Sequence, residues 1–390
     1  MTRRARFLVV AVLACLPITV LTPSAQQPTP PAAEPAVRLA GGTAGPTPEP
    51  AHRPRLRTAT IALSGDILVH DNVWASAQRL AARSGAGALD FRPMLASLRP
   101  ALTSADLAIC HLETPLAPPG GPYSGYPVFS APPQVVAALA WAGYDACSTA
   151  SNHSVDQGFA GITRTLDALD RHGLAHTGSA RTPQEAARHV VLDVNGIRVA
   201  WLSYTYGTNG MPVDADKPWS VNLIDPRRIE RDAHAARREG ADAVLVALHW
   251  GDEYSHTPSA FQRDLADRLT RDPDITLVYG HHAHVVQPIE RIHGTWVVFG
   301  LGNLLAGQGT TASGVDNGMV AFVTLRQRGD GPVRVATPTY RPTHIDYSDP
   351  RGEFRVWDDL AGLASPGLDP ATRAELRASL AQTRGVVGRP

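Results

Sequence analysis

The sequence predicts an α/β or α+β fold, in which layers of helices and sheets form one large domain. From Arg57 onward, short apolar runs typical of strands alternate with longer segments of helical periodicity. Five of these apolar runs end in short polar motifs, and the carboxyl ends of strands are where ligands bind in open α/β sheets. A chain of 390 residues is long enough to bury the large core that such a fold needs.

The expected elements follow one another along the chain. Residues 190–203 are expected to form a hairpin, because Asn195-Gly196 is a preferred two-residue turn. Other strands are expected at 59–64, 107–110, 145–149, 243–248, 275–279, 295–299 and 319–325. Helices are expected at 72–84, 133–141, 162–172, 226–238, 260–270 and 370–383. The segment 349–390 is treated as a C-terminal extension without an assigned role.

The N-terminus predicts export. Three arginines among the first six residues precede an apolar run and then small residues, so residues 1–25 are expected to be a secretory signal. An uncleaved membrane anchor is the alternative, and a lipoprotein is disfavoured because Cys15 lies inside the apolar run. The Pro-rich segment 26–56 is expected to be a disordered linker. The expected location is therefore secreted, or attached to the wall or the outer face of the membrane, with no further membrane span.

Charge and cysteine content narrow the function classes. The formal net charge is zero, which gives no reason to expect binding to nucleic acid or to an anionic membrane. Cys110 and Cys147 remain after removal of the signal. An exported protein can oxidise such a pair. Because each lies in an apolar, strand-like run, the sequence favours two buried thiols over a disulfide.

Five predicted strands end in Asp, Glu, Asn or His side chains, the donors that suit a divalent metal or a proton-transfer site. Each position taken alone also has a purely structural explanation. Gly65-Asp66 can be a turn, Glu113 a surface carboxylate, Asn152 part of an Asx-turn, and a histidine can be buried in the core with its hydrogen bonds satisfied. Three histidines within residues 280–284 are the strongest signal, and in an extended segment His282 and His284 would share a face. The five motifs are Gly65-Asp66, His111-Leu112-Glu113, Ser151-Asn152-His153, His249-Trp250-Gly251 and Gly280-His281-His282-Ala283-His284.

In this order the motifs, together with Leu301-Gly302-Asn303, resemble the poly-γ-glutamate capsule protein CapA family, which is similar to the calcineurin-type metallophosphoesterases. The resemblance covers residues 58–310 and places a CapA-like domain at 57–348. It implies a four-layer αββα sandwich with the site at one edge of two packed sheets. It also implies this ligand set: Asp66 and His284 at a first metal, Glu113 bridging, and Asn152, His249 and His282 at a second metal.

Several positions depart from the pattern that the resemblance implies. Metallophosphoesterases usually carry Asp-x-His in the first motif, but Leu68 stands at the histidine position and His70 lies two residues further on. His111 and Ser151 each stand where asparagine is usual, and Ala283 replaces proline. These departures leave open whether one or two metal ions bind, and whether the ion is Mn, Fe or Zn.

Three functions are compatible with these residues. The first is a metal-dependent hydrolase or transferase of the cell envelope that cleaves a phosphoester or amide bond, with His153 facing the substrate. The second is a metal-independent peptide epimerase that uses Asp66 and His284 as a proton-transfer pair. The third is a non-catalytic factor that binds a capsular polymer beside a membrane synthase complex. In each case the expected partner is a capsular or other cell-envelope polymer.

Overall fold

The computed structural model describes residues 55–308 and 314–388. The predicted signal segment 1–25 lies outside these ranges, as does the predicted linker 26–56 apart from its last two residues. No helix in the described ranges has both the length and the apolar composition needed to cross a membrane. The described residues belong to the compact unit that begins at Arg53.

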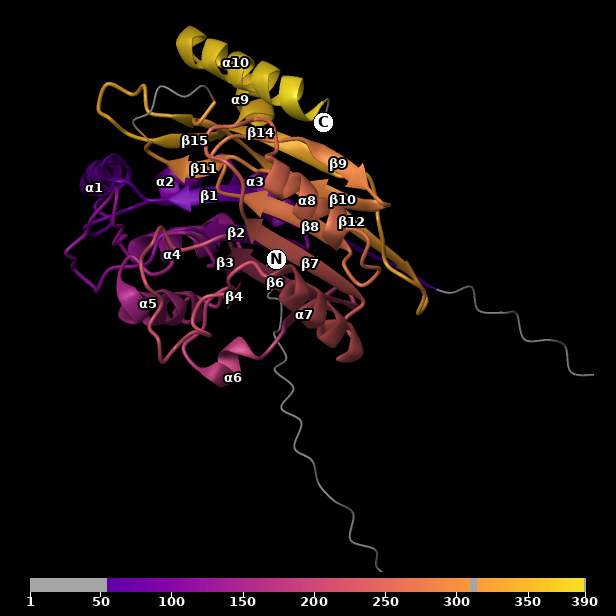
Figure 1. Cartoon of the computed structure of the whole chain (residues 1–390). Coiled ribbons are helices and arrows are strands. Elements are labelled where there is room, and N and C mark those ends of the chain that lie inside the picture. Colours follow the sequence, from indigo (N-terminus) through magenta and orange to yellow (C-terminus); the bar gives the residue numbers. More distant parts are fainter. Residues whose placement is uncertain (1–54, 309–313, 389–390) are drawn as a thin grey trace, which may run out of the picture. The chain divides into compact units, whose positions relative to one another are not determined.

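Two sheets lie at the centre of this unit (Figure 1). The larger sheet contains β1 (Leu56–Leu68), β2 (Leu107–Leu112), β3 (Ala146–Ser148), β4 (Ala175–Thr177), β11 (Asn303–Ala306), β12 (Asn317–Arg328), β13 (Arg334–Val335), β14 (Thr339–Asp346) and β15 (Arg355–Asp358). Its order is β15-β14-β12-β1-β2-β3-β4, with β11 paired to β1 and β13 to β12. The smaller sheet contains β5 (Val190–Val194), β6 (Ile197–Thr205), β7 (Ala243–His249), β8 (Leu277–His281), β9 (Ile289–Ile292) and β10 (Thr295–Val298). Its order is β5-β6-β7-β8-β10-β9.

The period-two alternation of strand side chains divides the core into layers. Ile61 and Leu63 of β1 pack with Trp201 of β6 in a cluster between the two sheets, whereas Ala62 belongs to the cluster under the helices of the larger sheet. The resulting order of helix, sheet, sheet and helix confirms the predicted αββα sandwich. The larger sheet is covered by α1 (Asp71–Ser84), α2 (Arg92–Leu95), α3 (Arg99–Ser104), α4 (Gln134–Ala142) and α5 (Gly158–Arg171), and the smaller one by α7 (Pro226–Arg238) and α8 (Ala260–Leu269).

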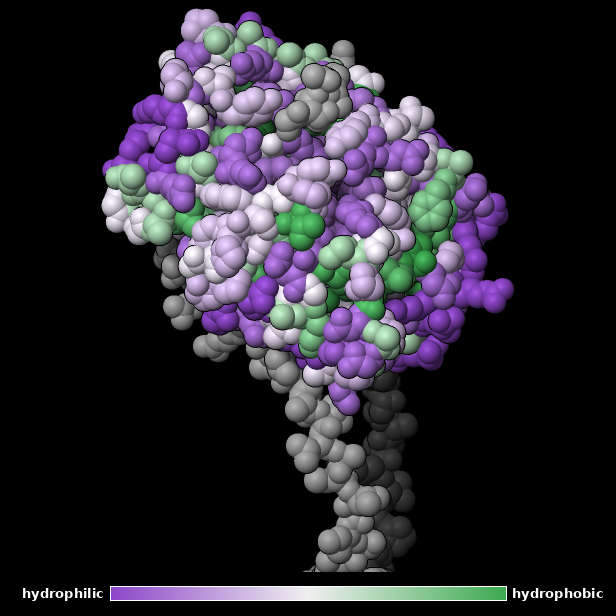
Figure 2. Space-filling view, turned by 60° about the vertical axis from the view of Figure 1, so that its left-hand side comes forward, coloured by the Kyte–Doolittle hydropathy of each residue, from purple (hydrophilic) through white to green (hydrophobic). Residues whose placement is uncertain are grey.

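Local sequence signals set several of the boundaries. The predicted hairpin is present as β5 and β6, and its turn residues Asn195 and Gly196 both have positive φ, as a type I′ turn requires. Ser259 begins α8 with a reciprocal capping box that includes Gln262. A short helix, α6 (Pro183–Ala186), lies before β5. On the surface, Figure 2 shows hydrophobic residues in small areas among mostly hydrophilic ones on the face in view.

The preference for two free thiols at Cys110 and Cys147 is wrong, because the structure joins them in a disulfide. The two residues lie directly opposite each other on the parallel strands β2 and β3. That register brings both side chains to the same face of the sheet, and the sequence alone does not reveal it. A disulfide is typical of proteins that fold in an oxidising compartment.

The C-terminal segment is part of the fold. β15 extends the larger sheet next to β14, and the helices α9 (Asp359–Ala364) and α10 (Pro370–Val387) pack against each other and against β14 (Figure 1). The helix expected at 370–383 corresponds to α10. One carboxyl group in this region is deeply buried: Asp359 accepts a hydrogen bond from Ser379 at 2.7 Å through one oxygen, and its other oxygen has no partner.

Asp359→Asn is expected to stabilise the protein at neutral pH but not in acid. Burial raises the pKa of Asp359 to about 7, from the value of about 3.9 that an unfolded chain has. Between these values the folded state binds the extra proton, so the free energy of unfolding falls as pH rises and is lowest above pH 7. Urea unfolding at about pH 5 and about pH 8 should show the gain of the variant growing with pH. Asp369→Asn, at an exposed helix cap, is the control, and an equal gain at both values for Asp359→Asn would contradict the prediction.

Gly280→Ala is expected to destabilise the fold at the floor of the site described below. A Cβ atom at Gly280 would lie 2.0 Å from the carbonyl oxygen of Phe299 and 2.3 Å from the indole nitrogen of Trp250. Because a backbone atom can move aside only at a large energetic cost, we expect the free energy of unfolding, measured in urea, to fall by about 1–3 kcal/mol. Gly385→Ala in α10, where a Cβ meets nothing within 4 Å, is the matched control and should gain stability from helix propensity. Equal stability of the two variants would contradict the prediction, because it would show that the structure around Gly280 can accommodate a Cβ atom.

Candidate metal centre

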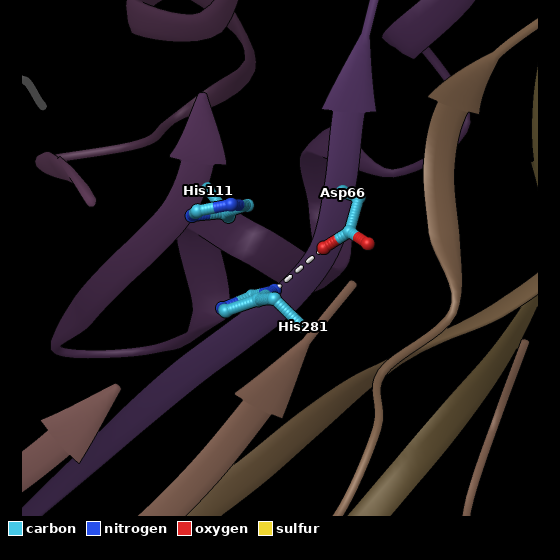
Figure 3. A group of neighbouring side chains, drawn as sticks. All are labelled: Asp66, His111 and His281. Carbon is cyan, nitrogen blue, oxygen red and sulfur yellow. Dashed lines mark hydrogen bonds and ion pairs between the residues drawn. The ribbon is translucent and has the colours of Figure 1, made fainter. Parts of the chain in front are cut away.

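The carboxyl ends of strands from both sheets meet at one place. Asp66 near the end of β1 lies opposite His111 of β2, and His249 of β7 lies opposite His281 of β8. Two short contacts join the sheets: Nδ1 of His281 lies 2.7 Å from Oδ1 of Asp66, and Nε2 of His111 lies 3.0 Å from Nδ1 of His249. Figure 3 shows the carboxylate of Asp66 directed toward His281, with the ring of His111 stacked above that of His281.

Asp66 is an ionised carboxylate held by donors. Besides the contact with His281, it accepts a hydrogen bond from the backbone N–H of His282 at 3.0 Å, and Nδ1 of His284 lies 3.4 Å from its Oδ2 atom. Burial alone would raise the pKa of Asp66, but the hydrogen bonds from His281 and His284 lower this pKa well below its ordinary value. The same neighbours act in reverse on His284: burial lowers its pKa, and the charges of Glu113 and Asp66 then raise it to about 9.

Glu113 is the least satisfied group in the described part of the site. Its side chain is fully buried, and neither carboxylate oxygen has a hydrogen-bond partner. Nε2 of His249 and Nε2 of His284 both lie 3.8 Å from Oε1 of Glu113, beyond hydrogen-bond distance. Burial therefore raises the pKa of Glu113 well above its ordinary value. A buried carboxylate that faces two imidazoles at this distance has the surroundings expected of a metal ligand.

The residues assigned to a second metal lie beside Glu113. Nε2 of His249 lies 2.8 Å from Oδ1 of Asn152, and the ring centroids of His249 and His282 are 4.7 Å apart. Nδ1 of His282 is buried and has no hydrogen-bond partner. Burial lowers the pKa of His249 well below its ordinary value and that of His282 to about 3, so both rings are neutral and able to ligate a cation.

Among the described residues, four groups of donor atoms at this site could hold a metal ion, because the ligand atoms within each group lie within 4.8 Å of one another. One of the four is Asp66, His111 and His281, which Figure 3 draws, and two others share Glu113. His282 does not join the group of His249; its atoms come together with those of His284 and the exposed Glu253 instead. The two groups that share Glu113 are Asp66, Glu113 and His284, and His111, Glu113 and His249.

The residues after β8 are not extended. His282 and His284 have φ values of 88° and 57°, so the chain bends sharply after His281. The two side chains do not share a strand face, yet their ring centroids are only 6.0 Å apart. Nδ1 of His284 also lies 2.9 Å from Oδ1 of Asn303, which places the Leu301-Gly302-Asn303 motif in support of this ring.

His153 lies at the wall of a pocket of about 500 Å³ that adjoins these groups. Its Nδ1 atom donates to the carboxylate of Asp156 at 2.7 Å, and the same oxygen accepts the backbone N–H of Phe129. Asn152 and His284 line the same pocket. His153 is thus oriented by a carboxylate and lies next to the proposed ligands, as expected for a residue that contacts substrate.

The sequence did not indicate the parts played by His111, His281 and His70. His111 precedes Glu113 by two residues on a strand, and this spacing is the signal that both share a face. His281 was part of the histidine motif but had no assigned role. His70 does not replace the histidine missing at Leu68, because its Nδ1 atom lies 3.1 Å from the backbone nitrogen of Gly307 and 3.0 Å from the carbonyl oxygen of Leu68.

A family model described as "Bacterial capsule synthesis protein PGA_cap" matches residues 60–308, which include every motif named above. The chain belongs to this family. Among its curated relatives, the PGA biosynthesis protein CapA of Bacillus subtilis is 31% identical over 206 residues, 51% of this chain and 53% of the relative. The capsule biosynthesis protein CapA of Bacillus anthracis is 29% identical over 225 residues, 57% of this chain and 53% of the relative. The chain thus spans about half the length of the curated relatives it matches.

A probable polyglutamine synthesis accessory protein of Mycobacterium tuberculosis is 28% identical over 214 residues, 52% of this chain and 56% of the relative. Solved structures show more distant likeness. A calcineurin-like phosphoesterase from Bacillus subtilis, YfkN, is 15% identical with a TM-score of 0.41, over 85% of this chain and 98% of that one. A phosphatase from Mycoplasma pneumoniae is 12% identical with a TM-score of 0.46, over 76% of this chain and 96% of that one. Neither likeness is close enough to bear on function.

Proposed function

We propose that this capsule synthesis family protein is an exported, metal-dependent hydrolase or transferase that acts on a cell-envelope polymer. The proposal rests mainly on the buried Glu113 carboxylate, which lacks any hydrogen-bond partner. Its oxygens belong to two candidate ligand groups, one with Asp66 and His284 and the other with His111 and His249. Keeping such a charge buried is costly unless a cation compensates it. The disulfide between Cys110 and Cys147 supports the exported part of the proposal.

Asp66, Glu113 and His284 would hold a first ion, and Glu113, Asn152 and His249 would hold a second. His282, which the resemblance assigns to the second ion, has its donor atoms beside those of His284 and Glu253 instead. A divalent cation of the Mn, Fe or Zn type supplies a Lewis acid that polarises the scissile bond and activates water. The chain itself supplies orientation. His153 is fixed through Nδ1 by Asp156 and lines the pocket, where its doubly protonated form can hydrogen-bond or protonate a departing oxygen through the other ring nitrogen.

The arrangement of Asp66 and His284 does not favour a metal-free epimerase. Two bases that exchange a proton on opposite faces of one carbon must have that carbon between them. Here Nδ1 of His284 and Oδ2 of Asp66 are 3.4 Å apart, so they face each other directly. The second candidate function is a non-catalytic, polymer-binding assembly factor, because the relative from Mycobacterium tuberculosis is named as a probable accessory protein.

Turnover assays separate these functions. Phosphoester and amide substrates should be cleaved by the metal-loaded protein, and exhaustive chelation should abolish the activity. His153→Gln should lower kcat while leaving metal content unchanged, because His153 lies outside the ligand groups. Cleavage that continues after chelation would refute the metal-dependent proposal. Polymer binding without turnover, retained in Asp66→Ala/His284→Ala, would favour the assembly factor.

A further inference from the structure

Exposed hydrophobic side chains gather around the pocket beside the metal centre. Nine large hydrophobic residues are exposed in the described part of the chain, and four of them line this single pocket. Two of the four are aromatic, Tyr126 and Tyr254, with 79% and 39% of their surface exposed. The other two are Val128 and Met211. Such exposure is unfavourable in free solution and is expected where a ligand covers it.

The described lining of the same pocket carries no lysine or arginine side chain. Its two carboxylates belong to Asp156 and Glu253. A run of carboxylates from a polyanion would meet like charge at Glu253 and no compensating cation beyond the metal centre itself. The rest of the polar lining consists of imidazoles and of the neutral amides of Asn152, Asn209 and Gln308.

The amides join the rim to the proposed metal ligands. Oδ1 of Asn209 accepts hydrogen bonds from Nδ2 of Asn152 and from the hydroxyl of Tyr206, both at 3.2 Å. Tyr206 is itself exposed, and its ring centroid lies 4.6 Å from that of His282. Neutral donors and acceptors thus line the same pocket as two exposed tyrosine rings, which matches a molecule that has hydroxyl edges and apolar C–H faces.

We propose that this pocket binds an uncharged sugar ring of the polymer substrate, next to the bond at the metal centre, and not a run of glutamate carboxylates. The proposal deepens the function given above and rests on it. Tyr254 and Tyr126 pack against the faces of the ring, and the amides of Asn209 and Gln308 hydrogen-bond its hydroxyl groups. The linkage beside this ring would then lie next to the residues proposed to hold the metal.

The test is a calorimetric titration of the metal-loaded protein with two probes: a neutral tetramer of N-acetylglucosamine and a tetramer of γ-linked glutamate. At concentrations up to about 10 mM, the sugar should bind and the glutamate tetramer should bind more weakly. Tyr254→Ala should weaken sugar binding by about fivefold or more, whereas Tyr254→Phe, which keeps the ring, should retain it. Phe261→Ala removes an exposed aromatic residue outside the pocket and should change nothing.

The outcomes separate this proposal from the proposed function. Tighter binding of the glutamate tetramer, no binding of the sugar, or equal loss in Tyr254→Phe and Tyr254→Ala would each overturn the sugar assignment. Metal content, measured on the same samples, reports on the metal centre alone. Sugar binding by a protein that holds no metal would therefore retain the pocket assignment and refute the hydrolase.

A separate observation concerns His111, which stands where the resemblance implies asparagine. Both of its ring nitrogens are engaged: Nδ1 lies 2.8 Å from the hydroxyl oxygen of Ser148, and Nε2 lies 3.0 Å from Nδ1 of His249. The Ser148 hydroxyl donates its one proton to the carbonyl of Cys110 at 3.3 Å, so its oxygen accepts from Nδ1–H of His111.

These contacts have one consistent direction. The contact between Nε2 of His111 and Nδ1 of His249 holds one proton. In the tautomer of His111 that carries its proton on Nδ1, facing Ser148, this shared proton belongs to Nδ1 of His249. The lone pair on Nε2 of His249 is left facing Oδ1 of Asn152 and Oε1 of Glu113, at 2.8 Å and 3.8 Å. Three acceptors that face one another are satisfied by a cation. We infer that His111, held by Ser148, is a positioning residue that fixes the ligating tautomer of His249.

Two variants of similar size test this role. His111→Gln keeps an acceptor for Nδ1–H of His249, whereas His111→Leu removes it. Zn²⁺ affinity should fall by about tenfold to a hundredfold in His111→Leu and stay nearly unchanged in His111→Gln. Nitrogen chemical shifts of His249 in the metal-free protein should show the proton on Nδ1 in the wild type and a mixture of tautomers in Ser148→Ala. A proton on Nε2 in the wild type, or equal affinity of the two His111 variants, would overturn the inference.

Discussion

Glu113→Gln is expected to stabilise the metal-free protein and to abolish most of its stabilisation by metal. The substitution removes a buried charge that has no hydrogen-bond partner, so the free energy of unfolding without metal should rise by about 1–3 kcal/mol. Wild-type protein should gain about 2.7 kcal/mol when the metal concentration is a hundred times its Kd. The variant should show almost none of this gain, because the amide supplies no negative charge to the ion. Urea unfolding with and without Mn²⁺ measures both effects.

Glu353→Gln is the matched control for this prediction. Glu353 is also a buried glutamate, but its carboxylate is paired with Arg83 and Arg351. Removing the charge of Glu353 should not stabilise the metal-free protein, because the substitution breaks the ion pairs with the two arginines. The stabilisation by metal should stay the same. A Glu113 variant that is less stable without metal, or that keeps the full response to Mn²⁺, would show that Glu113 has a structural role and is not a ligand.

Much of the fold follows from the sequence because its signals are local. Apolar runs and helical periodicity place the main strands and helices close to their observed bounds, and Asn195-Gly196 specifies the hairpin between β5 and β6. The candidate site follows in part for the same reason, since residues at the ends of parallel strands meet at one edge of a sheet. Asp66 and Glu113 are brought together in this way.

What the sequence does not reveal depends on how the sheets pair and pack. The Cys110–Cys147 disulfide depends on the register in which β2 pairs with β3. The residues next to the two cysteines do not indicate this register. The contact between His111 and His249 requires two different sheets to stack with their strand ends aligned. The chain bends at His282 because this residue has a positive φ, which is uncommon for residues other than glycine. The assumption that the segment is extended therefore places the His282 side chain wrongly.

The second large effect is expected in the double variant Asp66→Ala/His284→Ala. These two residues contact each other and share a candidate ligand group with Glu113. Removing both takes away one anionic and one imidazole ligand, and Glu113 is left without the imidazole of His284 at 3.8 Å. Metal content should therefore fall to near zero. Removing the two together also avoids leaving either one buried without its partner, which lowers the risk that the variant unfolds.

Metal content measured by elemental mass spectrometry decides whether this site holds a metal ion. The protein from Arg53 onward, the compact unit, is purified without chelators or a histidine tag, beside the Asp66→Ala/His284→Ala variant. We expect about one or two equivalents of Mn, Fe or Zn in the wild type and loss of that metal in the variant, with both proteins unfolding cooperatively. The absence of metal from both proteins, even after soaking in divalent cations, would contradict the metal centre and the hydrolase proposed from it.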